Sequence, residues 1–218
     1  MLTALIAGLA LQGEVQTIGS MREAMREGKI EGRTAIAPLA AKPHLYAIGP
    51  INGLSGEITV LDGVVHIGRV EAGRPDASVQ KDVRAVFLAY SYVETWTATE
   101  QKTKAGLAEI ADAVAKTKRA RTPFLITGEA ERTDFHIMDY RPDGEPWSMA
   151  KHDAAKAKFR FEGRSVTLFG FYTEQESDAG LFVHHGERLH VHVVADGATG
   201  HLDGIALKPG WRLHLPAE

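Results

Sequence analysis

The sequence predicts an α+β fold in which strands outnumber helices, and three observations favour this class. Short segments rich in β-branched and aromatic residues recur along the chain, and Asp-Gly pairs typical of tight turns follow two of them. Few segments carry apolar residues at helical spacing, so two or three helices are expected. Strands and helices do not alternate regularly, which excludes a doubly wound parallel sheet and favours mixed or antiparallel sheets.

The first half of the chain is expected to begin with a short helix and to continue into a hairpin. The tetrapeptide Ser-Met-Arg-Glu at 20–23 is a capping box, and Gly28 is the expected end of its helix. Residues 33–48 are expected to be irregular because two prolines interrupt them. Residues 56–63 then form a strand that ends in Asp-Gly, with 64–68 as its hairpin partner.

The remaining elements are predicted from the same patterns. Residues 83–93 are expected to form a strand, and Thr99 is expected to cap a helix that runs to about Lys116, because apolar residues there fall at helical spacing. Residues 151–161 are expected to form a short helix that runs into a strand. Further strands are expected at 124–127, 135–138, 166–172, 188–194, 201–207 and 211–215.

Composition limits the possible functions. The 218 residues are 44% hydrophobic and 24% charged, with a net charge of -3, which suits one large or two small globular domains. This charge gives no electrostatic reason to expect a nucleic-acid partner. The chain has no cysteine, so a metal would have to be held by histidine and carboxylate side chains.

The N-terminal segment, residues 1–14, contains an apolar run that allows two interpretations. It has the length of a signal-peptide core but lacks a basic leader, and it is too short to span a bilayer. The alternative is a strand or helix packed on the body of the protein. A cytoplasmic and an exported location both stay open, and no membrane span is expected.

Five of the ten histidines fall between residues 180 and 204. His190 and His192 are two apart, so on a strand they point to the same face of the sheet. His201 follows a turn at 196–200 that can fold the next strand back beside the first. Three imidazoles arranged in this way predict a transition-metal site with an open coordination position, which catalysis requires.

Other histidines are expected to be ordinary polar side chains, namely His66, His136, His152 and His214. His184 and His185 lie in an expected loop, where they rank below the trio as ligands. Glu57 starts a strand after the glycine-rich stretch 52–56, which allows close approach of a ligand. A solvated glutamate at a strand end explains Glu57 equally well.

The segments Asn52 to Gly63 and Leu168 to Tyr172, followed by His-x-His…Gly-His-Leu-Asp at 190–203, resemble α-acetolactate decarboxylase from about residue 15 onward. The resemblance implies an α+β fold of two related sheet regions, which we place at about 15–120 and 121–218. It also implies a divalent metal, usually zinc, on the residues matching His190, His192 and His201. A glutamate that matches Glu57 is implied to reach the ion or its substrate.

The reaction implied by the resemblance is decarboxylation of 2-acetolactate, or a related 2-hydroxy-3-keto acid, to acetoin or an analogous hydroxyketone. Loss of CO2 leaves an enediolate, whose charge a cation can stabilise, and Glu57 is the candidate for handling the proton. The family also uses an arginine for the substrate carboxylate, whose position here falls near His136 or Met138. Arg132 and Arg141 are the nearby candidates.

Two other functions stay open. A metal-binding or small-molecule-binding protein without catalysis would keep the histidines but not the arginine motif. A plant-and-prokaryote-conserved domain has a similar histidine block, but the acidic charge balance and the glycine–glutamate motif at 56–57 favour the decarboxylase. Edge strands make a homodimer a further expectation.

Overall fold

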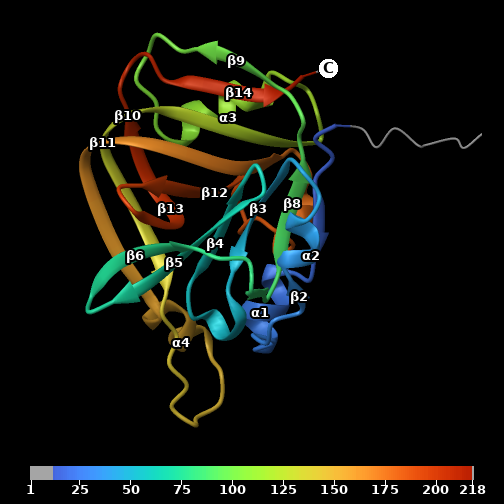
Figure 1. The fold of residues 1–218 in the computed structure, drawn as a ribbon, viewed down its shortest axis with the longest axis vertical. Coiled ribbons are helices and arrows are strands. Elements are labelled where there is room, and N and C mark those ends of the chain that lie inside the picture. The colour runs from blue at the N-terminus through green and yellow to red at the C-terminus, as the bar shows by residue number, and fades with distance from the viewer. Residues whose placement is uncertain (1–11, 218) are drawn as a thin grey trace, which may run out of the picture.

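The computed structural model describes residues 12–217, and two six-stranded antiparallel sheets dominate it (Figure 1). The first has the order β1-β8-β3-β4-β5-β6, with β1 at Gln16–Ile18, β3 at Leu45–Pro50, β4 at Glu57–Leu61, β5 at Val64–Glu71, β6 at Arg74–Val79 and β8 at Leu88–Tyr92. The second has the order β11-β12-β13-β10-β14-β9, with β9 at Trp96–Glu100, β10 at Arg121–Met138, β11 at Lys156–Thr173, β12 at Leu189–Ala195, β13 at Ala198–Leu207 and β14 at Arg212–Pro216. The predicted α+β class with antiparallel sheets is confirmed.

Helices are short and lie around the sheets. The described residues contain α1 at Met21–Glu27, α2 at Ala37–Ala40, α3 at Leu107–Ala115 and α4 at Met149–Ala154, one more than the largest number expected. The predicted helix start and end are confirmed, since the Ser20 hydroxyl accepts a hydrogen bond from the Glu23 amide at 3.2 Å and Gly28 ends the helix. The second half of the capping box is not formed, because the Glu23 carboxylate accepts from the Ser20 hydroxyl at 3.1 Å instead of from the Ser20 amide. Two short strands, β2 at Thr34–Ala35 and β7 at Arg84–Ala85, pair with each other.

Both predicted hairpins are present. β4 and β5 are joined by the two-residue turn at Asp62 and Gly63, and β12 and β13 by the turn at Asp196 and Gly197. In the second turn both residues have positive φ, 45° and 71°, which is the left-handed conformation that Asp-Gly adopts at least cost. The expected separate strands at 124–127 and 135–138 are parts of one strand, β10.

Two local predictions were wrong. Thr99 does not start a helix, because residues 96–100 form strand β9 on β14, and α3 begins only at Leu107. The segment 33–48 is not irregular, since it contains β2, α2 and most of β3. Pro38 stands in the first turn of α2, where its missing N–H costs nothing.

The two sheets pack face to face, and the chain passes from the first to the second between β8 and β9. β13 crosses β4 and β5, and β11 crosses β3. Phe169 and Phe171 of β11 pack with Tyr46 and Ile48 of β3 in one buried apolar cluster. The opposite face of the second sheet buries its side chains against α3, where Ile110 and other residues complete a second cluster. The site described below therefore lies between two faces that are both fixed by apolar packing.

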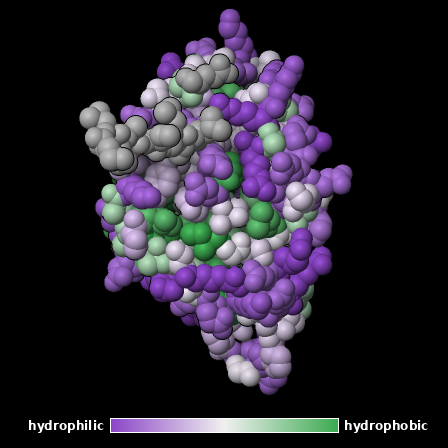
Figure 2. Space-filling model, turned by 90° about the vertical axis from the view of Figure 1, so that its right-hand side faces the viewer, coloured by the Kyte–Doolittle hydropathy of each residue, from purple (hydrophilic) through white to green (hydrophobic). Residues whose placement is uncertain are grey.

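The surface in Figure 2 is mostly hydrophilic, with apolar side chains gathered across the middle of that face. Among the described residues the large apolar side chains that are most exposed are Val64, Val79 and Met149. None of the helices described between residues 12 and 217 has the length and apolar character needed to cross a membrane. Residues 1–11, for which a signal-like or packed segment was expected, lie outside the described residues.

Gly68 on β5 sets how closely the sheets approach. A Cβ atom there would lie 2.0 Å from the Thr199 carbonyl oxygen of β13, a separation that only movement of the backbone can relieve. We expect Gly68→Ala to lower the free energy of unfolding by about 1–3 kcal/mol, the usual cost of overpacking. Urea denaturation measures this, with Gly204→Ala as the control, because its added Cβ meets no atom closer than 3.6 Å. Equal stability of the two variants would contradict the close contact.

Candidate metal and substrate site

Side chains along β12 point alternately to its two faces, so its histidines lie on one face and its core-forming valines on the other. Val191 and Val193 point into the apolar cluster against α3, so His190 and His192 project from the other face, toward the first sheet. Both imidazoles are almost fully buried. Because His190 and His192 are two residues apart on a strand, both side chains lie in the space between the sheets.

The tight turn brings His201 beside them. His192 of β12 and His201 of β13 are directly paired in the strand register, and their ring centroids lie 5.8 Å apart. The His190 ring lies 5.3 Å from that of His192 and 5.0 Å from that of His201. One nitrogen from each ring lies within 4.8 Å of the others, so the three residues could hold a single metal ion.

The histidines are in the protonation state that a metal requires. Burial lowers the pKa of His190 to about 3 and those of His192 and His201 well below the ordinary value. Neighbouring imidazoles lower them further. The Nδ1 atom of His190 and the Nε2 atom of His192 are buried without a hydrogen-bond partner among the described residues. Unpartnered buried nitrogens are costly unless a ligand satisfies them, so the donor set fits a cation.

The first sheet contributes Glu57 and Thr59 from alternate positions of β4. An oxygen of Glu57 lies 3.8 Å from Nε2 of His192, and the other accepts a 3.4 Å hydrogen bond from the Met138 amide. Glu57 is only 3% exposed, and this burial raises its pKa to about 8. The carboxyl group therefore carries a proton at neutral pH in the protein without metal.

The Thr59 hydroxyl connects the sheets at the histidines. Its oxygen lies 3.0 Å from Nδ1 of His192 and 2.7 Å from the Thr199 hydroxyl of β13. A hydrogen bond at Nδ1 fixes the ring of His192 and leaves Nε2 directed toward Glu57. This is the arrangement by which outer residues orient the imidazole ligands of metals.

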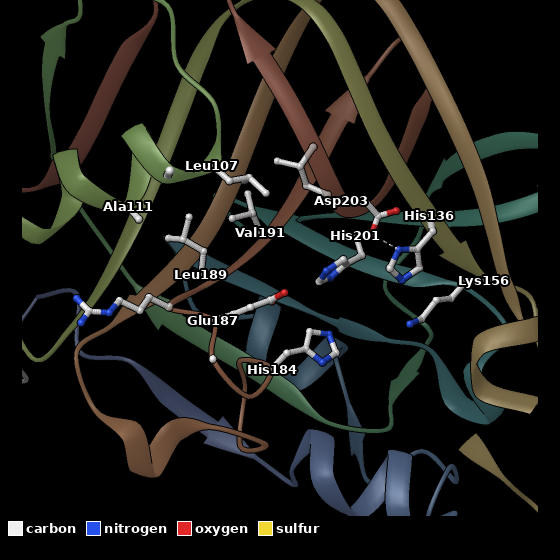
Figure 3. A pocket seen from close by; sticks show the side chains of 14 residues that line it. Leu107, Ala111, His136, Lys156, His184, Glu187, Leu189, Val191, His201 and Asp203 are labelled. Carbon is white, nitrogen blue, oxygen red and sulfur yellow. Dashed lines mark hydrogen bonds and ion pairs between the residues drawn. The ribbon is translucent and has the colours of Figure 1, made fainter. Parts of the chain in front are cut away.

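Two cavities meet at the histidines. The outer one has a volume of about 570 Å³, and Figure 3 shows the side chains of His136, Lys156, His184 and His201 directed into it. The inner one, about 40 Å³, is lined by those same four residues together with Glu57 and His190. Several apolar residues complete its wall, including Met21, Leu54, Phe87 and Met138. The outer cavity is large enough for a small organic acid, and it reaches the polar side chains of His136, Lys156 and His201.

Sequence reasoning assigned no chemical role to two of these residues, His136 and Lys156, and it ranked His184 below the trio as a ligand. His136 on β10 was interpreted as an ordinary polar side chain, but its Nδ1 lies 2.7 Å from a carboxylate oxygen of Asp203, and its ring centroid lies 4.7 Å from that of His201. His184 lies 5.9 Å from His201, and Lys156 was not considered. Asp203 belongs to the histidine block, but no feature of the sequence shows that its strand pairs with the strand of His136.

The structure does not bring the two predicted arginines to the site. Arg132 is half-exposed on β10 and pairs with Asp134 at 3.0 Å. Arg141 follows β10, is 78% exposed and pairs with Asp139 at 3.2 Å. Neither residue lines the outer or the inner cavity.

Comparisons with known proteins agree with this geometry. The family model for alpha-acetolactate decarboxylase matches residues 18–210. The solved alpha-acetolactate decarboxylase of Bacillus subtilis strain 168 superposes with a TM-score of 0.75 at 15% identity, over 94% of this chain and 86% of that one. A Staphylococcus aureus protein of unknown function, described as similar to alpha-acetolactate decarboxylase, gives the same values.

The enzyme from Bacillus subtilis subspecies spizizenii also superposes with a TM-score of 0.75, at 16% identity and with the same coverage. No curated protein sequence matches the chain. At such low identity the structural matches establish the shared fold, and the family match independently covers most of the sequence. This chain belongs to the alpha-acetolactate decarboxylase family.

Proposed function

We propose that the protein is a metal-dependent carboxy-lyase that converts 2-acetolactate, or a related 2-hydroxy-3-keto acid, to acetoin or the analogous hydroxyketone. One observation carries the proposal: three neutral imidazoles, two of them buried and each of those two with one nitrogen unpartnered among the described residues, lie beside a buried carboxyl group at the end of a cavity. This arrangement stands on the decarboxylase fold.

His190, His192 and His201 would hold the ion, which we propose to be zinc, because three imidazoles suit it and no thiolate is needed. A bound divalent cation would supply Lewis-acid polarisation of substrate oxygens and would offset negative charge that develops as CO2 leaves. The Thr59 hydroxyl holds the His192 ring in place for this role.

Glu57 is the proposed proton-handling group. Its burial favours the protonated form, and its position 3.8 Å from His192 puts it next to the ligand nitrogens. Decarboxylation leaves a carbon that must gain a proton, and a carboxyl group placed beside the ligand nitrogens is a suitable carrier of that proton. The inner cavity beside Glu57 is small and partly apolar, which limits the access of bulk water to the carbon that is protonated.

The second candidate is a metal-binding or small-molecule-binding protein without catalysis on the same fold. It is favoured by one observation, namely that Arg132 and Arg141 both lie outside the cavities. Release of CO2 from 2-acetolactate by metal-loaded protein separates the two candidates, because a binding protein would take up the ion and release none.

Removal of one proposed ligand tests the metal site. We expect His192→Ala to lose stoichiometric zinc, measured by elemental analysis, and to lose acetoin formation at the same time, as chelator treatment of the unaltered protein should. Zinc added back after chelation should restore activity to the unaltered protein only. His214→Ala on β14 is the control, because that ring bonds to Thr127 and is not part of the trio. Full metal content in His192→Ala would exclude this ligand set.

Replacement of the carboxyl group tests proton handling. We expect Glu57→Gln to keep its zinc, because the ligating imidazoles are intact, and to lower kcat about 100-fold or more, the usual contribution of an acid–base group. Steady-state kinetics with 2-acetolactate and parallel metal analysis measure both effects. The exposed Glu71→Gln serves as the control. Unchanged turnover in Glu57→Gln would remove Glu57 from the mechanism.

The buried titratable groups predict how the stability of the metal-free protein depends on pH. Each trio histidine has a lowered pKa in the folded protein, so its stabilising effect is present above pH 6.5 and is lost as the pH falls. Glu57 acts oppositely, since its raised pKa costs stability as the pH rises from 4.5 toward 8. Stability should therefore be greatest near neutral pH.

Below pH 6 the trio and Glu57 alone give the unfolded chain a net excess of about two protons, so the free energy of unfolding should fall by roughly 3 kcal/mol per pH unit or more. His66, His152, His184 and His214, whose pKa values are also lowered by burial, add to this fall. Urea denaturation of chelated protein between pH 5 and 8 measures this slope. A stability that does not change over that range would contradict the burial of neutral imidazoles.

A further inference from the structure

We propose that Lys156 is the cation that binds the carboxylate of the substrate, the role for which the family resemblance implied an arginine. The inference rests on the proposed function, because it assigns a partner to the acid group of a 2-hydroxy-3-keto acid. It concerns substrate binding and adds no step to the reaction.

The position of Lys156 follows from the junction of α4 and β11. The helix ends at Ala154, and Lys156 begins the long strand opposite Met138 of β10. Its side chain is 23% exposed and lines both the outer and the inner cavity. In Figure 3 its ammonium group points into the cavity, toward the space enclosed by His136, His184 and His201.

The other cations near the cavity are engaged elsewhere. Arg188 lines the outer cavity, but its guanidinium donates hydrogen bonds to Glu174 at 2.8 Å and to the Tyr172 hydroxyl at 3.2 Å. Among the residues that line the inner cavity, Lys156 is the single lysine or arginine within the part of the chain that the structure describes.

Lys156 is available to a ligand because its present partner is weak. Its Nζ atom lies 3.1 Å from a carboxylate oxygen of Asp153, which is 63% exposed. Ion pairs with an exposed partner contribute little free energy to stability. Lys156 can therefore leave Asp153 and bind a carboxylate inside the cavity at a small cost in free energy.

The chemistry determines which kinetic parameter should depend on Lys156. The ammonium pairs with the carboxylate in the bound substrate, but that group leaves as uncharged CO2, so the interaction does not strengthen in the transition state. Loss of such an interaction raises KM more than it lowers kcat. A single ammonium also imposes no planar fork on the carboxylate, unlike a guanidinium, so the acid group is held by charge rather than by orientation.

Lys156→Gln in the metal-loaded, full-length protein tests the inference. We expect KM for 2-acetolactate to rise about 10- to 100-fold with kcat changed less than about threefold, and Lys156→Arg to restore KM. Lys158→Gln is the matched control: it removes the same charge two residues along β11 from an exposed side chain outside both cavities.

A second measurement does not depend on turnover. Binding of 2,3-dihydroxy-2-methylbutanoate, which keeps the carboxylate but cannot decarboxylate as a keto acid, is followed by NMR titration, with uncharged acetoin as the comparison ligand. We expect Lys156→Gln to weaken binding of the acid about 10- to 100-fold and to leave acetoin binding unchanged. An equal loss for both ligands, or an equal loss in Lys158→Gln, would overturn the inference.

The two proposals fail in different ways. If metal-loaded wild-type protein turns over 2-acetolactate but Lys156→Gln has unchanged KM and unchanged acid binding, the assignment of Lys156 is wrong and the decarboxylase function stands. If the wild-type protein binds the acid through Lys156 yet releases no CO2, the proposed function is wrong and the carboxylate site stands.

Discussion

The Thr59 hydroxyl is bonded on one side to Nδ1 of His192 and on the other to the Thr199 hydroxyl, and this buried link joins the two sheets. A buried hydroxyl without partners would cost free energy, so the pairing favours one relative position of β4, β12 and β13. That position also sets the separation between Glu57 and the histidines. The geometry of the site therefore depends on how the sheets meet, and both sheets supply part of it.

A close backbone contact also fixes the relative position of the two sheets. Gly68 of β5 leaves no space for a side chain above the Thr199 carbonyl, so the sheets approach as closely as polypeptide permits. Apolar packing of Phe169 and Phe171 against β3 holds the rest of the interface. A rigid scaffold of this kind suits a site whose groups must stay within hydrogen-bonding and ligating distances of one another.

The parts of the site that the sequence predicted are local ones. His190 and His192 share a face because strands alternate, and His201 joins them through a two-residue turn that Asp196 and Gly197 specify. Glu57 was selected by motif and resemblance, since no local rule connects β4 with β12. The fold class followed from strand-rich patterning and the hairpin turns for the same local reasons.

What could not be predicted depends on pairing between distant segments. Residues 96–100 form a strand because β14 lies beside them, and the helical spacing farther along was extended too far toward Thr99. His136 reaches His201 through the β10–β13 register, and Lys156 enters the cavity because α4 ends just before it. Single-sequence patterns carry no information on such long-range contacts.

The bend at which α4 gives way to β11 has an evolutionary consequence. Residues 139–155 leave the sheets after β10 and return at Lys156, and Figure 1 shows this excursion extending from the body of the molecule. Insertions or deletions there would move the lysine along the mouth of the cavity while leaving the histidine-bearing hairpin untouched. The groups proposed to bind the acid and the ion therefore lie on segments whose lengths can change independently.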